Sequence, residues 1–570
     1  MKRVNQTVLS VLALGLIAGA PAVAAGTTVS QPAAVAPIQQ NERNQAVEKT
    51  LHMMQALVPE LKALKLQVKS YEPAIENRPA VWNLVYGNDA DKAKQPGKEA
   101  ESLMAHMQID AETGELLHYS FHHPAWKSSA AIDAEEAKQA AQSFLEALLG
   151  ESMKHYQIAD QVHVMQWGYA EENGKPSGVY HAAAVSVDRI VNGIPLRGYG
   201  MYLNIANGKI MSYDTENYGK MDLSLFPDPS KAISKTDAKT AYQKLLDMQL
   251  TYNDHEPVEL KRLGTEQVKT KPVLKYSPSF YGMIDALTGK EAELFEDPKP
   301  QQPMEWKLAP KGMVLRAESR EAVANLLHES FGIDVDDLSY EASERKEYSF
   351  AEQKLILHVW RSGEKEQEGG RYVTAAVEAK TGRVVNVNAY YISRKPQKPV
   401  VTMAEAEQKA KAFLEKHLPA DVTKLQLTNS YGPNMGQDRI PDWVDESKLS
   451  GTAVAEEPVY RFQLKETHGG IPVDSRSYGI AVDAVTGEIS SYFQYVTEKQ
   501  SLPGGKPVIT AEEAAALYMD TTELELVYYW PEYRGVKAPK PVLVYAAKPD
   551  GGGYRYVDAA TGKLVHVAEK

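Results

Sequence analysis

The sequence predicts an α+β protein made of six tandem modules, each with one helix packed on a three- or four-stranded antiparallel sheet. A short turn motif recurs six times, and a segment with the apolar period of a helix precedes each copy. The first three turns also match the last three at offsets of 268, 279 and 273 residues. We therefore expect the modules to form two duplicated three-module halves that behave as separable units.

The recurring turn reads Asp-Ala-x-Thr-Gly in its clearest copies. A first-position Asp can accept backbone N–H groups across the turn, and a left-handed backbone costs least at Gly. Apolar runs flank each copy, so each is predicted to be a β-hairpin with positive φ at its glycine. Position 5 is glycine in every copy and position 3 has a side-chain oxygen only at Glu112, which argues against metal binding at the turns. The six turn glycines are Gly114, Gly208, Gly289, Gly382, Gly487 and Gly562.

Amphipathic segments mark the expected helices. Thr402 is followed three residues later by Glu405, and Thr510 precedes Glu512 and Glu513, so both positions are typical of a helix start. The expected helices lie roughly at 45–64, 132–149, 234–250, 318–331, 402–418 and 510–519.

Further matches between the halves support the duplication. The corner Gly193-Ile194-Pro195 corresponds to Gly470-Ile471-Pro472, and the run 271–274 repeats the Lys-Pro-Val-Leu of 540–543. The predicted organisation is a signal peptide at 1–25, a flexible leader at 26–40, modules at 41–126, 127–220 and 230–297, a Pro-rich linker at 298–312, and modules at 313–395, 400–500 and 507–570.

The N-terminus is typical of a secretory signal. Lys2 and Arg3 precede an apolar run at 8–20, and small residues follow at 22–25. The run is shorter than the roughly 20 residues that span a bilayer, so we expect cleavage near Ala24 or Ala25. We expect a secreted, extracytoplasmic protein that has no membrane span after cleavage and that can associate with the cell wall.

Composition excludes several function classes. The 570 residues contain no cysteine, which excludes disulfides, thiolate nucleophiles and thiolate metal sites. The formal net charge of −12 lacks the basic excess of a protein held by phosphate contacts, so nucleic acid is not an expected partner. Tyrosines outnumber phenylalanines 31 to 10, which suits strands with one buried and one solvated face.

The helix, the Gly-Ile-Pro corner and the Asp-Ala-x-Thr-Gly turn together resemble PepSY-type modules. Their tandem layout behind a signal peptide resembles the YcdB/YcdC repeated-domain proteins of spore-forming bacteria, over nearly all of the mature chain. The resemblance implies an extracytoplasmic protein, and PepSY-like modules occur in protease propeptides and are associated with restraining peptidases. It carries over no catalytic residue, and the Gly-Ile-Pro corner occurs in two of the six modules.

Motifs for chemistry are missing. The sequence has no His-Glu-x-x-His, Gly-x-Ser-x-Gly, phosphate loop or dinucleotide fingerprint. His122 and His123 are adjacent, and neighbouring residues on a strand point to opposite faces, so we interpret them as part of a connector and not as a metal site. We expect no cofactor and no metal.

The fifth predicted module contains a long loop that its sister module lacks. The loop holds Tyr431, Arg439 and Trp443, and tryptophan and arginine are favoured anchors in protein interfaces. These three residues are the predicted binding residues. The alternative is a tolerated insertion without function.

The leading hypothesis is a non-enzymatic interaction protein that binds or restrains a peptidase or a cell-wall component. It rests on a scaffold repeated six times without a repeated reactive group. One alternative is an extracytoplasmic hydrolase whose site is assembled between modules. Another is a propeptide-like or folding-assistant protein.

Overall fold

The computed structural model describes residues 37–567 except 76–77, 89–102, 128–129, 131, 171–175, 216–220, 258–269, 281, 293, 295–303, 348–352, 363–369, 393–397, 434–439, 446–457, 497–498, 534–535 and 549–552. The predicted signal peptide, residues 26–36 of the predicted leader and residues 298–303 of the predicted Pro-rich linker lie outside the described residues. The first helix, α1 (Pro37–Leu57), begins before the predicted leader ends. Proline is well tolerated in the first turn of a helix, which is consistent with this earlier start.

The first large sheet has 11 strands, most of them from the N-terminal half. Its strand order is β1-β2-β3-β4-β8-β7-β21-β24-β11, and β6 pairs with both β5 and β7. Helices α1 and α2 (Ala134–Leu149) pack on it. The strands are β1 (Lys65–Glu72), β2 (Val81–Gly87), β3 (Met104–Asp110), β4 (Leu116–His122), β5 (Tyr156–Ala170), β6 (Pro176–Val191), β7 (Ile194–Ala206), β8 (Lys209–Thr215), β11 (Ile284–Asp285), β21 (Leu524–Tyr529) and β24 (Val542–Ala547).

The second large sheet has 13 strands and repeats the plan of the first. Its order is β13-β14-β15-β16-β20-β19-β9-β10-β25-β26, while β12, β17 and β18 extend from β19. Helices α4 (Arg320–Phe331) and α5 (Met403–His417) pack on it. The strands are β9 (Met248–Pro257), β10 (Thr270–Pro278), β12 (Met304–Lys307), β13 (Ser339–Glu347), β14 (Gln353–Arg361), β15 (Gly370–Glu378), β16 (Val384–Ile392), β17 (Lys424–Tyr431), β18 (Val459–His468), β19 (Ile471–Asp483), β20 (Ile489–Val496), β25 (Tyr554–Asp558) and β26 (Lys563–Val567). A separate small hairpin joins β22 (Glu532–Tyr533) to β23 (Val536–Lys537).

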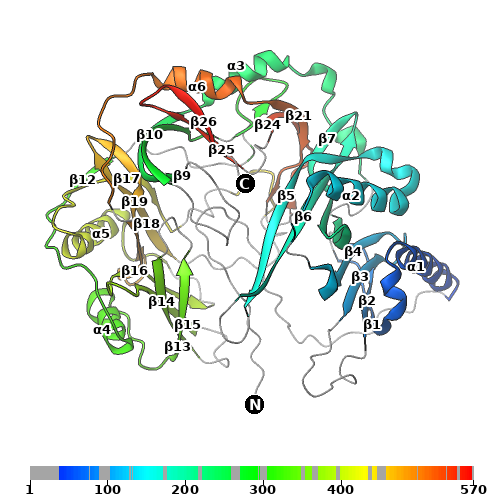
Figure 1. Ribbon diagram of the computed structural model, residues 1–570, viewed down its shortest axis with the longest axis horizontal. Coiled ribbons are helices and arrows are strands. Elements are labelled where there is room, and N and C mark those ends of the chain that lie inside the picture. The colour runs from blue at the N-terminus through cyan, green and yellow to red at the C-terminus, as the bar shows by residue number, and fades with distance from the viewer. Residues whose placement is uncertain are drawn as a thin grey trace.

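Helices lie on the outer rim of the molecule and the sheets lie inside them (Figure 1). Along the chain, α1, α2, α4 and α5 are each followed by four strands that pair antiparallel. The fold is therefore a mixture of helices and large antiparallel sheets in which one arrangement occurs twice.

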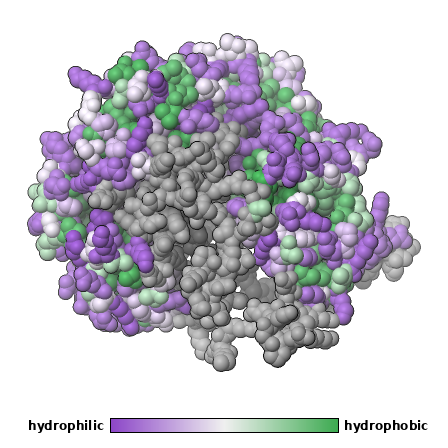
Figure 2. All heavy atoms as spheres, viewed as in Figure 1, coloured by the Kyte–Doolittle hydropathy of each residue, from purple (hydrophilic) through white to green (hydrophobic). Residues whose placement is uncertain are grey.

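In the same view the described surface is mostly hydrophilic, with small hydrophobic patches (Figure 2).

Some of the strands that follow α3 (Lys235–Leu245) and α6 (Ala511–Asp520) are exchanged between the two sheets. Strands β9 and β10 lie in the second sheet and β21 and β24 in the first, while β11, β25 and β26 stay in the sheet of their own half. Strand β9 joins the second sheet by running parallel to β19, where Tyr252 faces Val473. Strand β21 joins the first sheet by running parallel to β7, where Tyr528 faces Leu196. The expectation that the two halves are separable units is contradicted by this pairing, because each sheet is completed by strands of the other half.

The three larger hydrophobic clusters among the described residues follow this arrangement. One lies between the first sheet and α1 and α2, and a second lies between the second sheet and α4 and α5. A third cluster joins residues of α3 and α6 to strands of both halves, as the burial of Tyr242, Tyr518 and Tyr528 illustrates. The exchanged region thus has its own core, and that core holds the halves together.

The six turn glycines adopt the conformation that the sequence predicts. Their φ angles are all positive, from 67° at Gly208 and Gly382 to 74° at Gly114 and Gly487. Asp110 Oδ1 accepts the backbone N–H groups of Glu112 and Thr113 at 2.7 and 2.8 Å. Asp285, Asp483 and Asp558 do the same in their turns.

The turn before β8 is built differently. Asn207 as well as Gly208 has positive φ, which is the signature of a two-residue type I′ hairpin. Its first-position residue, Asn204, donates instead to Ser212 Oγ at 2.8 Å across the sheet. In this copy of the motif, the first-position side chain hydrogen-bonds to the neighbouring strand and not to the backbone of the turn.

One expected helix is shorter than predicted. The segment 234–250 is helical only to Leu245, and Met248 already begins β9. Residues 248–250 pair with 276–278 of β10, so the end of the predicted helix is part of a strand instead.

Candidate functional site

The inner face of the first sheet carries a row of polar side chains. On β3, Ala105 and Met107 point into the core and are almost fully buried, while His106 points the other way. On β4, Tyr119 is buried in the same core, and Ser120 lies on the inner face. Because side chains alternate in direction along β3 and β4, one face of the sheet packs on the core and the other presents polar side chains that can bind a ligand.

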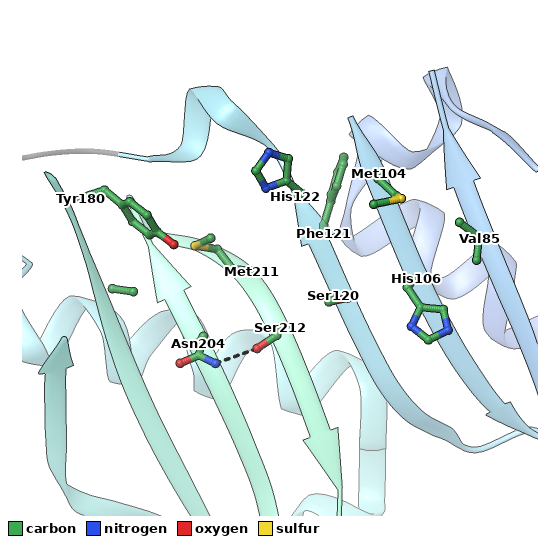
Figure 3. Close-up of a pocket in the computed structure, with 11 residues that line it drawn as sticks. Val85, Met104, His106, Ser120, Phe121, His122, Tyr180, Asn204, Met211 and Ser212 are labelled. Atoms are coloured by element: carbon green, nitrogen blue, oxygen red, sulfur yellow. Dashed lines mark hydrogen bonds between the residues drawn. The ribbon is translucent and has the colours of Figure 1, made fainter. Parts of the chain in front are cut away.

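A pocket of about 570 Å³ lies on this inner face, where β4 pairs with β8. Figure 3 shows its lining side chains projecting from strands β2, β3, β4, β6, β7 and β8. Apolar groups are interleaved with hydrogen-bonding groups, a composition typical of ligand pockets. The lining residues are Val85, Met104, His106, Ser120, Phe121, His122, Tyr180, Ala182, Asn204, Met211 and Ser212.

A hydrogen-bond relay lies on this inner face and ends at the pocket wall. His118 on β4 lies directly opposite Asp214 on β8, and His118 Nδ1 is 2.5 Å from Asp214 Oδ1. The other ring nitrogen, Nε2, is 3.3 Å from Ser120 Oγ. The order carboxylate, imidazole, hydroxyl is that of a serine nucleophile with its base and orienting acid.

A second polar pair lies beside the relay. Asn204 Nδ2 donates to Ser212 Oγ, as the dashed line in Figure 3 marks. The Oδ1 atom of Asn204 is buried and has no hydrogen-bond partner within the described part of the chain. A buried acceptor without a donor is costly, so this atom is suited to receive an N–H or O–H group of a ligand.

Two further histidines line the pocket. Burial lowers the pKa of His106, and the neighbouring His118 lowers it further, against an opposing effect of Glu72. Burial also lowers the pKa of His122, together with Lys127 and His123. Both side chains therefore remain neutral to lower pH than a free histidine, and each can donate or accept a hydrogen bond.

The predicted binding loop lies elsewhere. Tyr431 ends β17 in the second sheet, and its hydroxyl hydrogen-bonds to Asn429. Trp443 is partly exposed beside the buried Val444. Arg439 lies outside the described residues. Neither Tyr431 nor Trp443 lines the pocket on the first sheet.

The pocket and relay residues His106, His118, Ser120, Asn204, Ser212 and Asp214 were missed by sequence reasoning. A signal was present, since polar residues alternate with apolar ones in β3 and β4. The pairing of β4 with β8, which joins His118 to Asp214, has no local sequence signal. Among the described residues, no group of three or more histidine, aspartate or glutamate side chains is placed to hold a metal ion.

Two matching sheets, each built from helix-and-four-strand units, define a duplicated α+β repeat protein. The family model of the YcdB, YcdC repeated domain matches residues 48–217 and 337–496, which together make up more than half of the chain. The chain therefore belongs to the YcdB/YcdC repeated-domain family. The first matched region contains β1 to β8 and the second contains β13 to β20, and neither includes the exchanged strands.

One solved structure similar to the chain is the C-terminal domain of YpeB from Bacillus megaterium. It is 13% identical, covers 45% of this chain and 100% of its own, and has a TM-score of 0.24. No curated protein matches the chain. Within the described residues, no helix is long and apolar enough to cross a membrane.

Proposed function

We propose that this chain is a secreted, non-enzymatic interaction protein that holds a polypeptide segment of a partner in the pocket of the first sheet. The partner class we favour is a peptidase at the cell surface, whose activity the binding restrains. The signal-like N-terminus supports the location, and the resemblance to PepSY-type modules supports the partner class. The buried Oδ1 of Asn204, which has no hydrogen-bond partner within the described part of the chain and lies in a pocket of mixed apolar and hydrogen-bonding groups, is the observation that carries the proposal.

The chemistry of the pocket fits a peptide. Met104 and Met211 are flexible apolar groups that adapt to different side chains. Asn204 and His106 offer hydrogen bonds of the kind that an extended backbone requires. An apolar side chain flanked by its own peptide groups would satisfy both sets at once.

Photo-crosslinking tests this proposal on intact cells. A benzophenone amino acid replaces Tyr180 in the pocket, and the control carries it at Val400, an exposed position outside the pocket. We expect position 180 to capture a peptidase. Met104→Glu should abolish the capture and leave the thermal midpoint within a few degrees, because Met104 lines the pocket but is exposed. The purified chain should then inhibit the captured enzyme. Equal capture from both positions, or capture without inhibition, contradicts the proposal.

The loop around Trp443 remains a second proposed contact. Replacing Trp443 and Arg439 by Ala should leave the thermal midpoint nearly unchanged, because the partly exposed Trp443 contributes little to the core. Binding of the captured partner should weaken by about 2 kcal/mol if these residues are anchors. Unaltered affinity, measured by calorimetry, would restrict the interface to the pocket.

The relay favours a second function, hydrolysis of an acyl compound. His118 Nε2 would take the proton of Ser120 as its oxygen attacks a carbonyl carbon, and Asp214 would hold the imidazolium. Ser120 lies in the middle of a strand, where neighbouring backbone N–H groups serve the sheet. An oxyanion would therefore depend on side-chain donors such as His106, and for this reason we rank the binding function first.

Labelling with a fluorophosphonate separates the two functions. If the chain only binds, the probe leaves no adduct on Ser120. If it hydrolyses, the adduct forms and is lost in Ser120→Ala and His118→Gln but kept in Ser212→Ala, the matched serine across the β4–β8 pair. Mass spectrometry of the labelled chain reads out both results.

A further inference from the structure

A second pocket, of about 590 Å³, lies where the two halves exchange strands. Residues from α3, α6, β7, β10, β24 and β25 line it, so both halves contribute. It is separate from the pocket on the first sheet and shares no lining residue with it. Its volume is in the range of small-molecule sites.

Equivalent positions of the duplicated halves line this junction pocket in pairs. Arg197 and Asp474 each follow the Gly-Ile-Pro corner by two residues. Tyr242 and Tyr518 occupy the same position after the N-caps Ser234 and Thr510. Pro278 and Ala547 stand equally far from the Lys-Pro-Val-Leu runs. The pocket is therefore lined by corresponding residues of the two halves.

The charges break this symmetry. Arg555 and Gly282 are equivalent, since each precedes its turn aspartate by three residues, yet one carries a guanidinium and the other no side chain. Similarly, the position equivalent to Arg197 in the other half is occupied by a carboxylate residue, Asp474. Joining the two duplicated halves would not by itself require these charge differences. We therefore attribute them to ligand binding in the pocket.

The charged residues that line the pocket are mostly cationic. Besides Arg197 and Arg555, Lys275 and Lys548 line the pocket, and the carboxylate on the described lining is that of Asp474. Asp474 is already held by Lys465 at 2.7 Å and by the Thr251 hydroxyl at 2.8 Å. The carboxylates that contact the cations, such as Glu256 at 2.6 Å from Lys275, are not lining residues.

Neutral side chains are among the groups that hold Arg555 in place. Its guanidinium lies 4.5 Å from the ring centre of Tyr518 and donates to Thr521 Oγ1 at 2.5 Å. It is only 9% exposed. A rigid, buried guanidinium beside aromatic and aliphatic groups is well suited to bind a carboxylate or a phosphate.

We propose that the junction pocket binds a small anion that carries a carboxylate or a phosphate group, with Lys548, Lys275 and Arg555 as its charged contacts. Because the pocket is formed by both halves, its occupancy stabilises the exchanged arrangement by mass action. This proposal does not depend on the proposed function, since the two pockets are separate.

Titration of the mature chain tests the proposal. The probes are citrate for carboxylates, glycerol 3-phosphate for phosphates and glycerol as the uncharged control. We expect saturable binding of one or both anions at one site per chain by calorimetry, and a thermal midpoint that rises with anion concentration. Citrate binding alone identifies the ligand class as carboxylate, and glycerol 3-phosphate binding alone identifies it as phosphate. No saturable binding of either anion overturns the proposal.

Two lysines provide a matched comparison. Lys548 and Lys235 both lie 3.5 Å from Glu523 Oε1, but only Lys548 is among the described lining residues of the pocket. We expect Lys548→Gln to weaken anion binding about tenfold and Lys235→Gln to change it less than about twofold. Equal weakening by both substitutions would mean diffuse surface charge and would overturn the site.

A substitution that fills the pocket tests it without changing charge. Ala547 lines the pocket on β24, and leucine there adds three carbon atoms to the cavity. We expect Ala547→Leu to keep a cooperative unfolding transition and to lose binding of both anions. If the folded variant binds them as the parent does, the anions lie elsewhere and the proposal fails.

Discussion

Single residues decide how tightly each turn is held against its helix. Gly114 has φ 74°, and a Cβ there would lie 2.8 Å from the Cβ of Ala46 on α1 and 2.9 Å from its carbonyl oxygen. Gly208 has φ 67°, but a Cβ there would meet nothing within 4 Å. An added side chain would therefore meet both an unfavourable backbone conformation and close packing at Gly114, but only the unfavourable conformation at Gly208.

This contrast predicts unequal costs for the same substitution. Gly208→Ala should lower the free energy of unfolding by about 1 kcal/mol, the cost of a left-handed alanine. Gly114→Ala should cost about 3 kcal/mol, because the added methyl group also displaces α1. Urea denaturation measures both. Equal losses would mean that the close approach to Ala46 is relieved without cost.

At the scale of elements, capping residues fix where helices begin. Thr402 accepts the backbone N–H of Glu405, and Glu405 accepts the N–H of Thr402, which closes a capping box at the start of α5. Thr510 and Glu513 repeat it at α6. These starts could be predicted because every group involved lies within four residues of the sequence.

Removing one cap should therefore have a local and modest effect. Thr402→Ala should lower the free energy of unfolding by about 1 kcal/mol, whereas Thr402→Ser keeps the hydroxyl and should be close to neutral. Chemical denaturation compares the three chains. A serine variant as unstable as the alanine variant would show that the methyl group of Thr402, and not its hydrogen bond, matters.

Strand pairing shows where sequence reasoning stops. The hairpins of β3 and β4 or of β25 and β26 could be predicted because their partners are adjacent in the chain. Nothing local specifies that β9 pairs with β19, more than 200 residues away, since either sheet offers a similar edge. For the same reason the polar alternation of β4 could be seen, but not the meeting of His118 with Asp214.

At the scale of the whole molecule, a buried ion pair links the halves. Asp254 on β9 is fully buried and accepts hydrogen bonds from Arg476 on β19 at 2.8 and 2.9 Å, and from Ser475. Burial alone would raise the pKa of Asp254, but hydrogen bonds from Ser475, His255 and Arg476 hold it below its usual value. The charged form is therefore favoured by the native state.

The sign of the pH dependence follows from this lowered pKa. The stabilisation is complete above the unfolded pKa of about 3.9 and is lost as the pH falls through the lower folded value. Below about pH 4, the free energy of unfolding should fall with pH more steeply in the parent than in Asp254→Asn. That variant should lose about 3 kcal/mol at neutral pH, because Arg476 stays buried without its main partner. Exposed Asp222→Asn is the control, and an equal neutral-pH loss in both variants would contradict the role.

The exchanged strands also predict how fragments behave. Residues 41–298 and 313–570 expressed separately should show no cooperative unfolding, because each sheet lacks strands of the other fragment. Co-expressed, they should assemble into a one-to-one complex on size-exclusion chromatography. Two independently folding monomers would contradict the interlocked arrangement.

The interlocking has a consequence for biogenesis. Asp254 contacts Ser475 across 221 positions, and Asn192 contacts Tyr528 across 336, so the contact order of the junction is high. A chain synthesised from its N-terminus presents β9 and β10 long before β19 emerges to pair with them. Until then a strand edge remains unpaired, in the form most prone to join another chain. The last hundred residues therefore control whether the first three hundred complete their fold, and truncation near the C-terminus should be as damaging as loss of either sheet.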